Sequence, residues 1–144
     1  METRARRHRR LRGAAAGLAL LVACGGMKNP ASVADKFVDR YYVESDQQGA
    51  LPFAAGVAAL RLKDELRLTA EARAPGNPLP SRQVRVYYTR SSLSGEGAER
   101  TADYKLDIRP QGGGSLQREA HLTLARQDDG TWRVVRFHET QPGR

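Results

Sequence analysis

The clearest pattern in the chain runs Thr101-Ala102-Asp103-Tyr104-Lys105-Leu106-Asp107-Ile108-Arg109. Every second residue from Ala102 to Ile108 is apolar, and the residues between them are polar or charged. This two-residue period indicates a β-strand with one face in the core and the other in water. Asp103 and Asp107 fall on the polar face, opposite Tyr104. The segment therefore predicts one strand of a half-buried antiparallel sheet.

Neighbouring segments extend the sheet, with turn residues between them. We expect three further strands at residues 82–93, 116–127 and 131–139. Gly95 and Gly97, the three glycines from Gly112, and Asp129-Gly130 supply the turns. The last strand carries apolar residues on both parities, so both of its faces are expected to be covered in part.

Upstream of the strands the apolar period becomes helical. Asn29 is a good N-cap and Pro30 suits the first helical position, so a helix is expected to begin near residue 30. Its apolar residues recur at steps of four: Val33, Phe37 and Tyr41. The polar segment 45–49 ends it.

A second helical region is expected from residue 50 to 74. Its apolar stripe is traced by Leu51, Ala55, Ala58, Leu62, Leu66 and Thr69. Gly56 destabilises a helix interior by about 1 kcal/mol relative to Ala, so one kinked helix and two shorter helices both fit the pattern.

Helices followed by hairpin-linked strands predict an α+β domain. The order of these elements, together with the closing segment Asp129-Gly130-Thr131-Trp132-Arg133-Val134-Val135-Arg136-Phe137, resembles the nuclear transport factor 2-like superfamily. The resemblance covers residues 30–140. It implies N-terminal helices packed on a curved antiparallel sheet of about four strands, a cone-like fold of the cystatin and nuclear transport factor 2 kind. It also implies a short strand between the helices and the main sheet, for which residues 66–70 are the candidate.

The N-terminus reads as an export signal. Six arginines in the first 12 residues precede an apolar run of eleven residues, 13–23, which is too short to span a bilayer and typical of a signal peptide. Leu21-Val22-Ala23-Cys24 resembles the lipobox of bacterial lipoproteins. The resemblance implies that Cys24 becomes the lipidated N-terminus, and the alternative is an ordinary signal peptide with an incidental cysteine.

These assignments divide the chain into a signal peptide (1–23), a lipidated tether (24–29), a single α+β domain (30–140) and a frayed tail (141–144). We expect an exported protein anchored by lipid to a bacterial membrane. Gly25 after the cysteine indicates the outer membrane, facing the periplasm, if the host is Gram-negative. Because Cys24 is the only cysteine, the lipidation that the resemblance implies would leave no thiol for a disulfide or redox motif.

The net charge of +8 belongs mostly to the leader. The first 23 residues hold six of the 24 basic and one of the 16 acidic residues, which leaves 18 and 15, a net charge of +3. We therefore expect no nucleic-acid partner. The arginines predicted on the sheet suit either an anionic ligand, lipid headgroup or acidic partner, or a solvated surface; they are Arg82, Arg85, Arg90, Arg109, Arg118, Arg126, Arg133 and Arg136.

The cone-like fold implies a cavity between the helices and the concave side of the sheet, which different members use as an enzyme site, a ligand pocket or a docking surface. Candidate pocket residues are Tyr41, Tyr88, Tyr104 and Trp132. An enzyme of the ketosteroid isomerase kind would use Asp103 or Asp107 as the general base and a tyrosine as the hydrogen-bond donor. Both aspartates, however, fall on the polar face of their strand.

His121 is a further candidate for catalysis. With His138 it makes up the histidines after the leader, and two histidines without a cysteine or clustered carboxylates predict no metal site. No cofactor is expected.

The sequence favours a membrane-anchored, non-enzymatic ligand-binding or protein-assembly domain in the cell envelope. Its partners would be the membrane, through Cys24, and a protein or small ligand in the envelope. Two alternatives stay open: a small-molecule isomerase or dehydratase-type enzyme that uses the cone cavity, and a structural component of an envelope or secretion complex.

Overall fold

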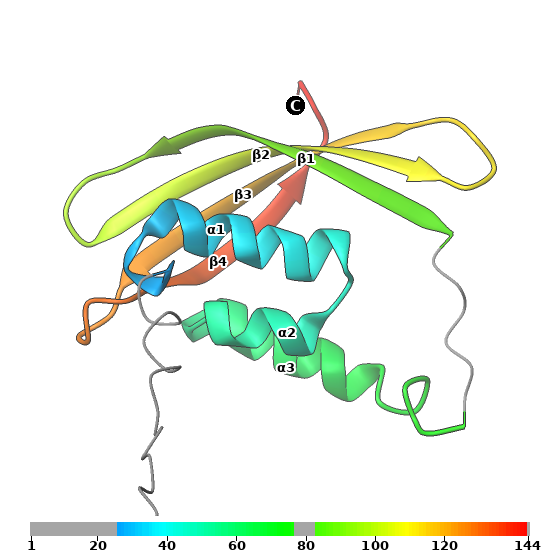
Figure 1. Ribbon diagram of the computed structural model, residues 1–144, viewed down its shortest axis with the longest axis horizontal. Helices are drawn as coiled ribbons and strands as arrows, with labels where there is room; N and C mark the ends of the chain where they lie inside the picture. Colours follow the sequence, from blue (N-terminus) through cyan, green and yellow to red (C-terminus); the bar gives the residue numbers. More distant parts are fainter. Residues whose placement is uncertain (1–25, 77–82, 144) are drawn as a thin grey trace, which may run out of the picture.

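A computed structural model describes residues 26–76 and 83–143. Helices occupy the first of these ranges and a four-stranded sheet the second (Figure 1). The helical elements are η1 (Gly26–Lys28), α1 (Pro30–Val38), η2 (Asp39–Val43), α2 (Gln47–Ala50), η3 (Leu51–Phe53) and α3 (Gly56–Leu68). The strands are β1 (Val84–Ser94), β2 (Glu99–Pro110), β3 (Leu116–Arg126) and β4 (Trp132–Thr140).

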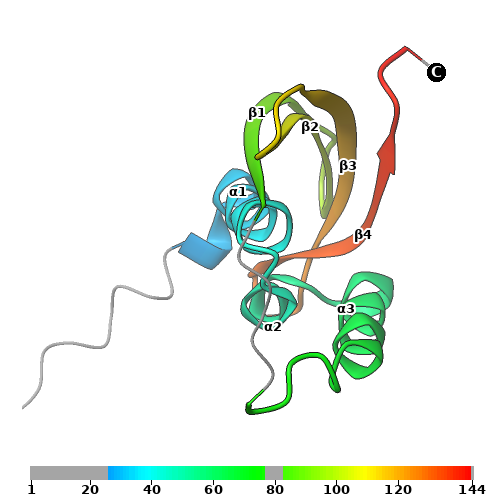
Figure 2. The same cartoon turned by 90° about the vertical axis from the view of Figure 1, so that its right-hand side faces the viewer.

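The sheet is an antiparallel meander in which each strand pairs with the next one along the chain. It bends strongly, with α1 against its concave side and α3 beside β4 (Figure 2). The predicted α+β class and the curved sheet of four strands are confirmed. We call the side that faces α1 the inner face and the opposite side the outer face.

Two β-bulges decide which side chains reach the inner face. In β4, Thr123 pairs with Arg136 but Leu124 pairs with Val134, so Val135 is the extra residue. A bulge resets the alternation of the strand. Phe137 therefore lies on the inner face with Val134, and both are buried. The sequence predicts that both faces of this strand are covered in part, because its apolar residues fall on both parities. The bulge corrects this prediction, since it brings Val134 and Phe137 to the same face.

The second bulge is at Ser91 in β1. Arg90 pairs with Tyr104, whereas Ser92 pairs with Asp103. Arg90 and Ser92 are two residues apart, yet they lie on opposite faces of the sheet. The same strand places Val86 and Tyr88 on the inner face, in register with Ile108 and Leu106.

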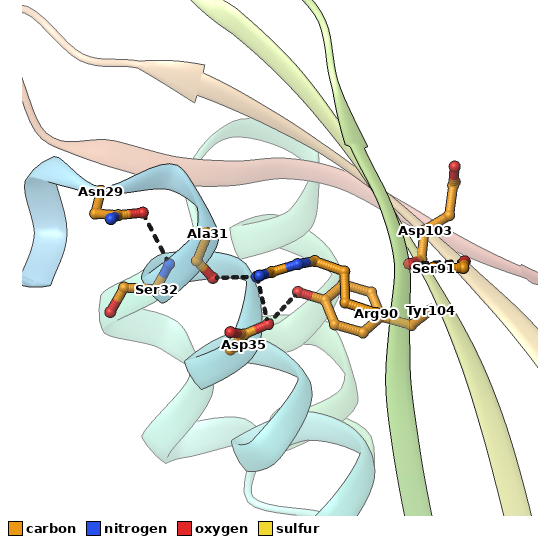
Figure 3. A network of polar contacts seen from close by, with 8 residues as sticks. All are labelled: Asn29, Ala31, Ser32, Asp35, Arg90, Ser91, Asp103 and Tyr104. Atoms are coloured by element: carbon orange, nitrogen blue, oxygen red, sulfur yellow. Dashed lines mark hydrogen bonds and ion pairs between the residues drawn. The ribbon is translucent and has the colours of Figure 1, made fainter.

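The first helix begins where the sequence predicts. The side chain of Asn29 accepts a 3.2 Å hydrogen bond from the backbone amide of Ser32, and Pro30 is the first helical residue (Figure 3). Such a cap satisfies one of the amides that an α-helix leaves unpaired at its start. Val33 and Phe37 from its apolar face are buried, as expected.

Of the two alternatives for the second helical region, the structure shows shorter helices, and the last of them ends before residue 74. The short α2 and η3 come first, the chain becomes extended at Ala54 and Ala55, and α3 begins only at Gly56 and ends at Leu68. Gly56 has a φ of +54°, a conformation that side chains disfavour, which explains the break. Of the predicted stripe, Ala58 and Leu62 are buried, but Thr69 is exposed because it lies past the helix end.

Residues 66–70, the one candidate for the short strand that the resemblance implies, form no strand, because Leu66 to Leu68 belong to α3 and a turn follows. Instead, Ala54 makes an isolated parallel bridge with Val134, and the amide of Ala55 donates to the carbonyl of Val134 at 2.9 Å. The contact between the helical region and the sheet edge therefore comes before α3 rather than after it.

The core lies between α1 and the inner face. Its side chains come from every main element, which ties the helices and the sheet into one cluster. The buried apolar residues are Val33, Ala34, Phe37, Val38, Ala50, Ala58, Leu62, Ala102, Tyr104, Leu106, Ala120, Leu122, Leu124, Trp132, Val134 and Phe137. Residues from the predicted apolar parities of β2 and β3 make up much of this set, so those alternations are confirmed.

Within residues 26–76 and 83–143, the helices are all too short or too polar to cross a bilayer. Cys24, residues 1–23, which are expected to be a signal peptide, and Arg82 lie outside the described residues.

Candidate functional site

Of the predicted pocket residues, Tyr88, Tyr104 and Trp132 line the inner face. Tyr104 has no exposed surface and Trp132 only 6%. The Tyr88 ring packs edge-on against Tyr104, with 5.7 Å between the ring centroids. Burial, followed by the nearby carboxylate of Asp39, raises the pKa of Tyr88 to about 12. These rings are packed as core side chains.

Asp35 on α1 joins the helix to the inner face. Its Oδ1 atom accepts a 2.7 Å hydrogen bond from the Tyr104 hydroxyl and a 2.8 Å bond from Arg90, whose guanidinium also donates to the carbonyl of Ala31 (Figure 3). Burial, and then the hydrogen bond to Asp35, raise the pKa of Tyr104. The Tyr104 hydroxyl is therefore a fixed donor whose proton is already used inside the protein.

Tyr41 lies in a second cluster, between η2, α3 and β4. Its hydroxyl donates to Glu65 at 2.9 Å and accepts from Arg61 at 3.2 Å. Arg61 also donates to Glu65 at 2.9 Å and stacks on the Phe137 ring, 4.2 Å from its centroid. Burial and the Glu65 hydrogen bond raise the pKa of Tyr41. The cluster closes the side of the core that α3 and β4 share.

A π-helical turn, η2, positions this cluster. Such turns hold one more residue than an α-turn and are common at functional sites. Here the turn places both Tyr41 and Tyr42 half-buried, with 4.8 Å between their ring centroids. The buried hydroxyl of Tyr42 lies beside Glu139 but makes no hydrogen bond of ordinary length to a described residue. Burial first, and then Glu139, raise its pKa.

The outer face carries a row of polar side chains that crosses the sheet. Ser92 on β1 donates to Asp103 on β2, and Asp103 Oδ1 lies 2.7 Å from Nδ1 of His121 on β3. The other ring nitrogen of His121 is 3.0 Å from the hydroxyl of Thr140 on β4. His138 stacks on His121, with 4.9 Å between the ring centroids. One row thus links all four strands.

Desolvation acts to raise the pKa of Asp103, but the hydrogen bonds from Ser92 and His121 outweigh it, so this pKa lies below its ordinary value. The order carboxylate, imidazole, hydroxyl is that of nucleophilic catalytic triads. Those triads also need oxyanion donors and a substrate pocket beside the nucleophile. The row instead lies on the open outer face of the sheet and joins neighbouring strands, which favours an interstrand brace.

Asp107 is also on the outer face. It pairs with Arg109 and accepts a 3.0 Å hydrogen bond from the side-chain amide of Gln117 on β3. Its carboxylate is therefore occupied from two sides.

The structure brings Asp103 and His121 together, and Tyr88 with Tyr104, but it separates these two groups by the thickness of the sheet. Figure 3 shows Asp103 pointing away from the helices while Tyr104 points toward α1. Tyr41 is in the separate cluster with Glu65. A base on Asp103 or Asp107 and a donor on Tyr88 or Tyr104 therefore do not face a common space. In the described ranges, no cluster of three or more His, Cys, Asp or Glu could hold a metal ion.

Several residues of these networks were missed from the sequence. Asp35 is not among the predicted site residues, and Arg90 is named only in the set of sheet arginines, for which a binding role and a solvated surface are both open. The sequence does hold a signal for Arg90, which falls on the same side of its strand as Val86 and Tyr88 and so on the inner face. Arg61, Glu65 and Thr140 gave no signal, because their partners are distant in sequence.

No protein-family model matches the chain, and no curated protein matches it in sequence. Solved structures share its fold. A protein assigned as a candidate calcium/calmodulin-dependent protein kinase type II association domain from Thiobacillus denitrificans aligns with a TM-score of 0.59 and 10% identity, over 78% of this chain and 94% of that one.

A ketosteroid isomerase-like protein from Erwinia carotovora atroseptica aligns with a TM-score of 0.56 and 8% identity, over 84% of this chain and 99% of that one. A protein of unknown function with a cystatin-like fold from Nostoc punctiforme aligns with a TM-score of 0.53 and 12% identity, over 78% of this chain and 90% of that one. At such identities the likeness shows the fold alone. The fold is that of the nuclear transport factor 2-like and cystatin-like domains.

Proposed function

We propose that the protein is a lipid-anchored binding or assembly domain of the bacterial cell envelope, which works through its surface and not through chemistry inside the cone. The observation that carries the proposal is the state of the inner face. Tyr104 is fully buried there, and its hydroxyl is bonded to Asp35 on the helix that covers it.

An enzyme in the cone would need a base within hydrogen-bond reach of a bound substrate. Asp103 and Asp107 are on the other side of the sheet from Tyr104. Asp35 reaches the inner face, but its Oδ1 atom already accepts from Tyr104 and Arg90. The two aspartates predicted as bases are thus turned away from the cone, and Asp35 is engaged in holding α1 to the sheet.

The anchoring half of the proposal is supported by the resemblance to a lipobox and by the short spacing that follows it. Asn29 already caps α1, so five residues, 25–29, separate Cys24 from the helix. A fully extended chain of that length reaches about 18 Å at most. Binding would therefore take place close to the membrane surface.

The outer face is the surface best suited to binding. Its side chains are held by hydrogen bonds between strands, as in the row from Ser92 to Thr140, and they are polar. Groups that are already ordered lose little conformational entropy on association. Solved structures with this fold include one assigned as a candidate association domain and one named ketosteroid isomerase-like, so the fold is compatible with both assembly and ligand binding.

Photo-crosslinking tests the assembly form of the proposal. A benzoylphenylalanine placed at Lys105, exposed on the outer face, should give a defined crosslinked product in the native host. The matched control is the same group at Lys63, exposed on α3. Adding Cys24→Ser should abolish the product. Equal crosslinking from both positions, or none from Lys105, would contradict assembly through the outer face.

A further inference from the structure

Two arginines lie directly opposite each other at one end of the outer face. Arg85 on β1 and Arg109 on β2 are register partners in an antiparallel pair. Like charges in directly opposed positions of a sheet repel each other and destabilise it. Counter-charges within the protein or an anion from outside would reduce this repulsion.

The counter-charge is incomplete. Asp107 pairs with Arg109, whose guanidinium also lies 4.8 Å from the centroid of the Tyr87 ring. Arg85 makes no ion pair with any residue in the ranges 26–76 and 83–143. The two arginines and one aspartate leave a net positive charge, with Arg109 held in place and Arg85 free to move onto a ligand.

Both arginines line a cleft of about 360 Å³ at the end of the β1–β2 pair. Gln83 and Gln111 form its polar end and are joined by a 2.7 Å backbone hydrogen bond from Gln111 to the carbonyl of Gln83. Tyr87 supplies an aromatic wall. This volume is at the small end of the range for ligand sites, which is about 300–1,000 Å³.

The lining selects a type of ligand. Guanidinium groups bind phosphate oxygens through paired, charge-assisted hydrogen bonds, and amide side chains add neutral donors. Tyr87, on the outer face, offers apolar contact to a group attached to the phosphate, and Val84 and Pro110 continue the cleft around the ends of the two strands. We propose that this cleft binds the phosphate group of a phosphomonoester, with Arg85 and Arg109 on its oxygens and the organic part against Tyr87.

This site rests on the proposed function only in taking the outer face as the binding surface. It requires neither the lipid anchor nor a protein partner. The phosphate could come from a soluble phosphomonoester or from a lipid headgroup of the same chemistry, and the experiment separates the two.

The test is calorimetric titration of the full chain, in a non-ionic detergent, with phenyl phosphate, and co-sedimentation with vesicles containing phosphatidic acid. Wild-type protein should bind phenyl phosphate saturably, and more weakly as salt is raised. Arg85→Gln should weaken binding about tenfold, whereas Arg85→Lys should retain part of it, because a lysine keeps the charge but not the paired donors.

The matched control is Arg126→Gln, which removes an exposed arginine from the far end of β3 and should change the affinity less than twofold. Because Arg85→Gln relieves the repulsion with Arg109, its melting temperature should be equal to or above that of the wild type. Vesicle binding that depends on Arg85, without binding of phenyl phosphate, assigns the site to a lipid headgroup.

Three results would overturn the proposal. The first is that neither probe binds saturably at up to about 10 mM phosphate groups. The second is that the wild type and Arg85→Gln bind equally well. The third is that Arg85→Gln and Arg126→Gln lose the same amount of affinity. The last would mean that general positive charge, and not the cleft, attracts the anion. None of these results bears on whether the outer face binds a protein, which the crosslinking experiment decides.

Discussion

The hydroxyl of Tyr104 donates a 2.7 Å hydrogen bond to Oδ1 of Asp35, so a fully buried side chain of β2 is fastened to the helix that covers it. Arg90 on β1 donates to the same oxygen. Three elements therefore meet at one carboxylate atom. The contact both closes the inner face and consumes the tyrosine that an enzyme of this fold could have used as a donor.

Replacing Tyr104 by Phe should lower the free energy of unfolding by about 1–2 kcal/mol, because the ring still fills its site but the bond to a charged acceptor is lost. Asp35 keeps Arg90 as a partner, which limits the cost. Chemical denaturation measures the change. Tyr87→Phe is the control, since that side chain is 49% exposed on the outer face. A cost for Tyr104→Phe no larger than for the control would show that the bond contributes nothing.

Trp132→Ala should cost about 3–5 kcal/mol, since it removes a large side chain that is 6% exposed at the start of β4. That is a large part of the 5–15 kcal/mol typical of a whole domain. Thermal unfolding followed by circular dichroism reports it. Leu68→Ala on α3, where the leucine is 67% exposed, should change stability by under about 0.5 kcal/mol. Comparable losses in both variants would place Trp132 outside the core.

The Asp103 row predicts a pH dependence. The pKa of Asp103 is lowered in the folded protein. At pH values below about 3.9, the ordinary pKa of an aspartate, the unfolded chain therefore binds more protons than the folded one. The stabilisation that ionised Asp103 gives the folded protein is complete above that pH. It is lost as the pH falls through the pKa of Asp103 in the folded protein. Asp103→Asn should therefore flatten the fall in melting temperature below about pH 4, and Ser92→Ala should do so in part. An unchanged acid limb in Asp103→Asn would refute the role of these hydrogen bonds.

The proposed lipid anchor can be tested independently of the fold. Wild-type protein expressed in bacteria should incorporate labelled palmitate and partition into detergent, whereas Cys24→Ser should stay unlabelled in the aqueous phase. Two acyl chains give stable anchoring, while one gives only marginal binding. Identical labelling of the two proteins would remove Cys24 as the attachment point.

The strands could be predicted because their alternation is a local property. The apolar residues of β2, Ala102 to Ile108, face inward and Asp103 and Asp107 face outward, as their parity requires. Asn29 marks the start of α1 for the same reason, since a cap acts within three residues. These features needed no knowledge of the tertiary structure.

The bulges at Ser91 and Val135 could not be predicted, because an extra residue is tolerated only through its pairing with another strand. Each bulge changed which residues meet: Ser92 lies on the outer face beside Asp103, and Phe137 joins the core. The break before α3 was anticipated at Gly56, but the extended residues before it depend on a bond to Val134. The polar networks could not be predicted for the same reason, since the residues that bond to each other are far apart in sequence.

The central claim is that the inner face around Tyr104 is filled by the protein's own side chains and that binding occurs elsewhere. Titration of isotope-labelled protein with 2-naphthol, an apolar ring probe, tests it by nuclear magnetic resonance. We predict no saturable shifts at Leu106 and Leu122 in the wild type. Leu106→Ala, which creates a cavity there, serves as the positive control. Saturable shifts at these two residues in the wild-type protein would contradict the account and return the cone to consideration as a ligand pocket.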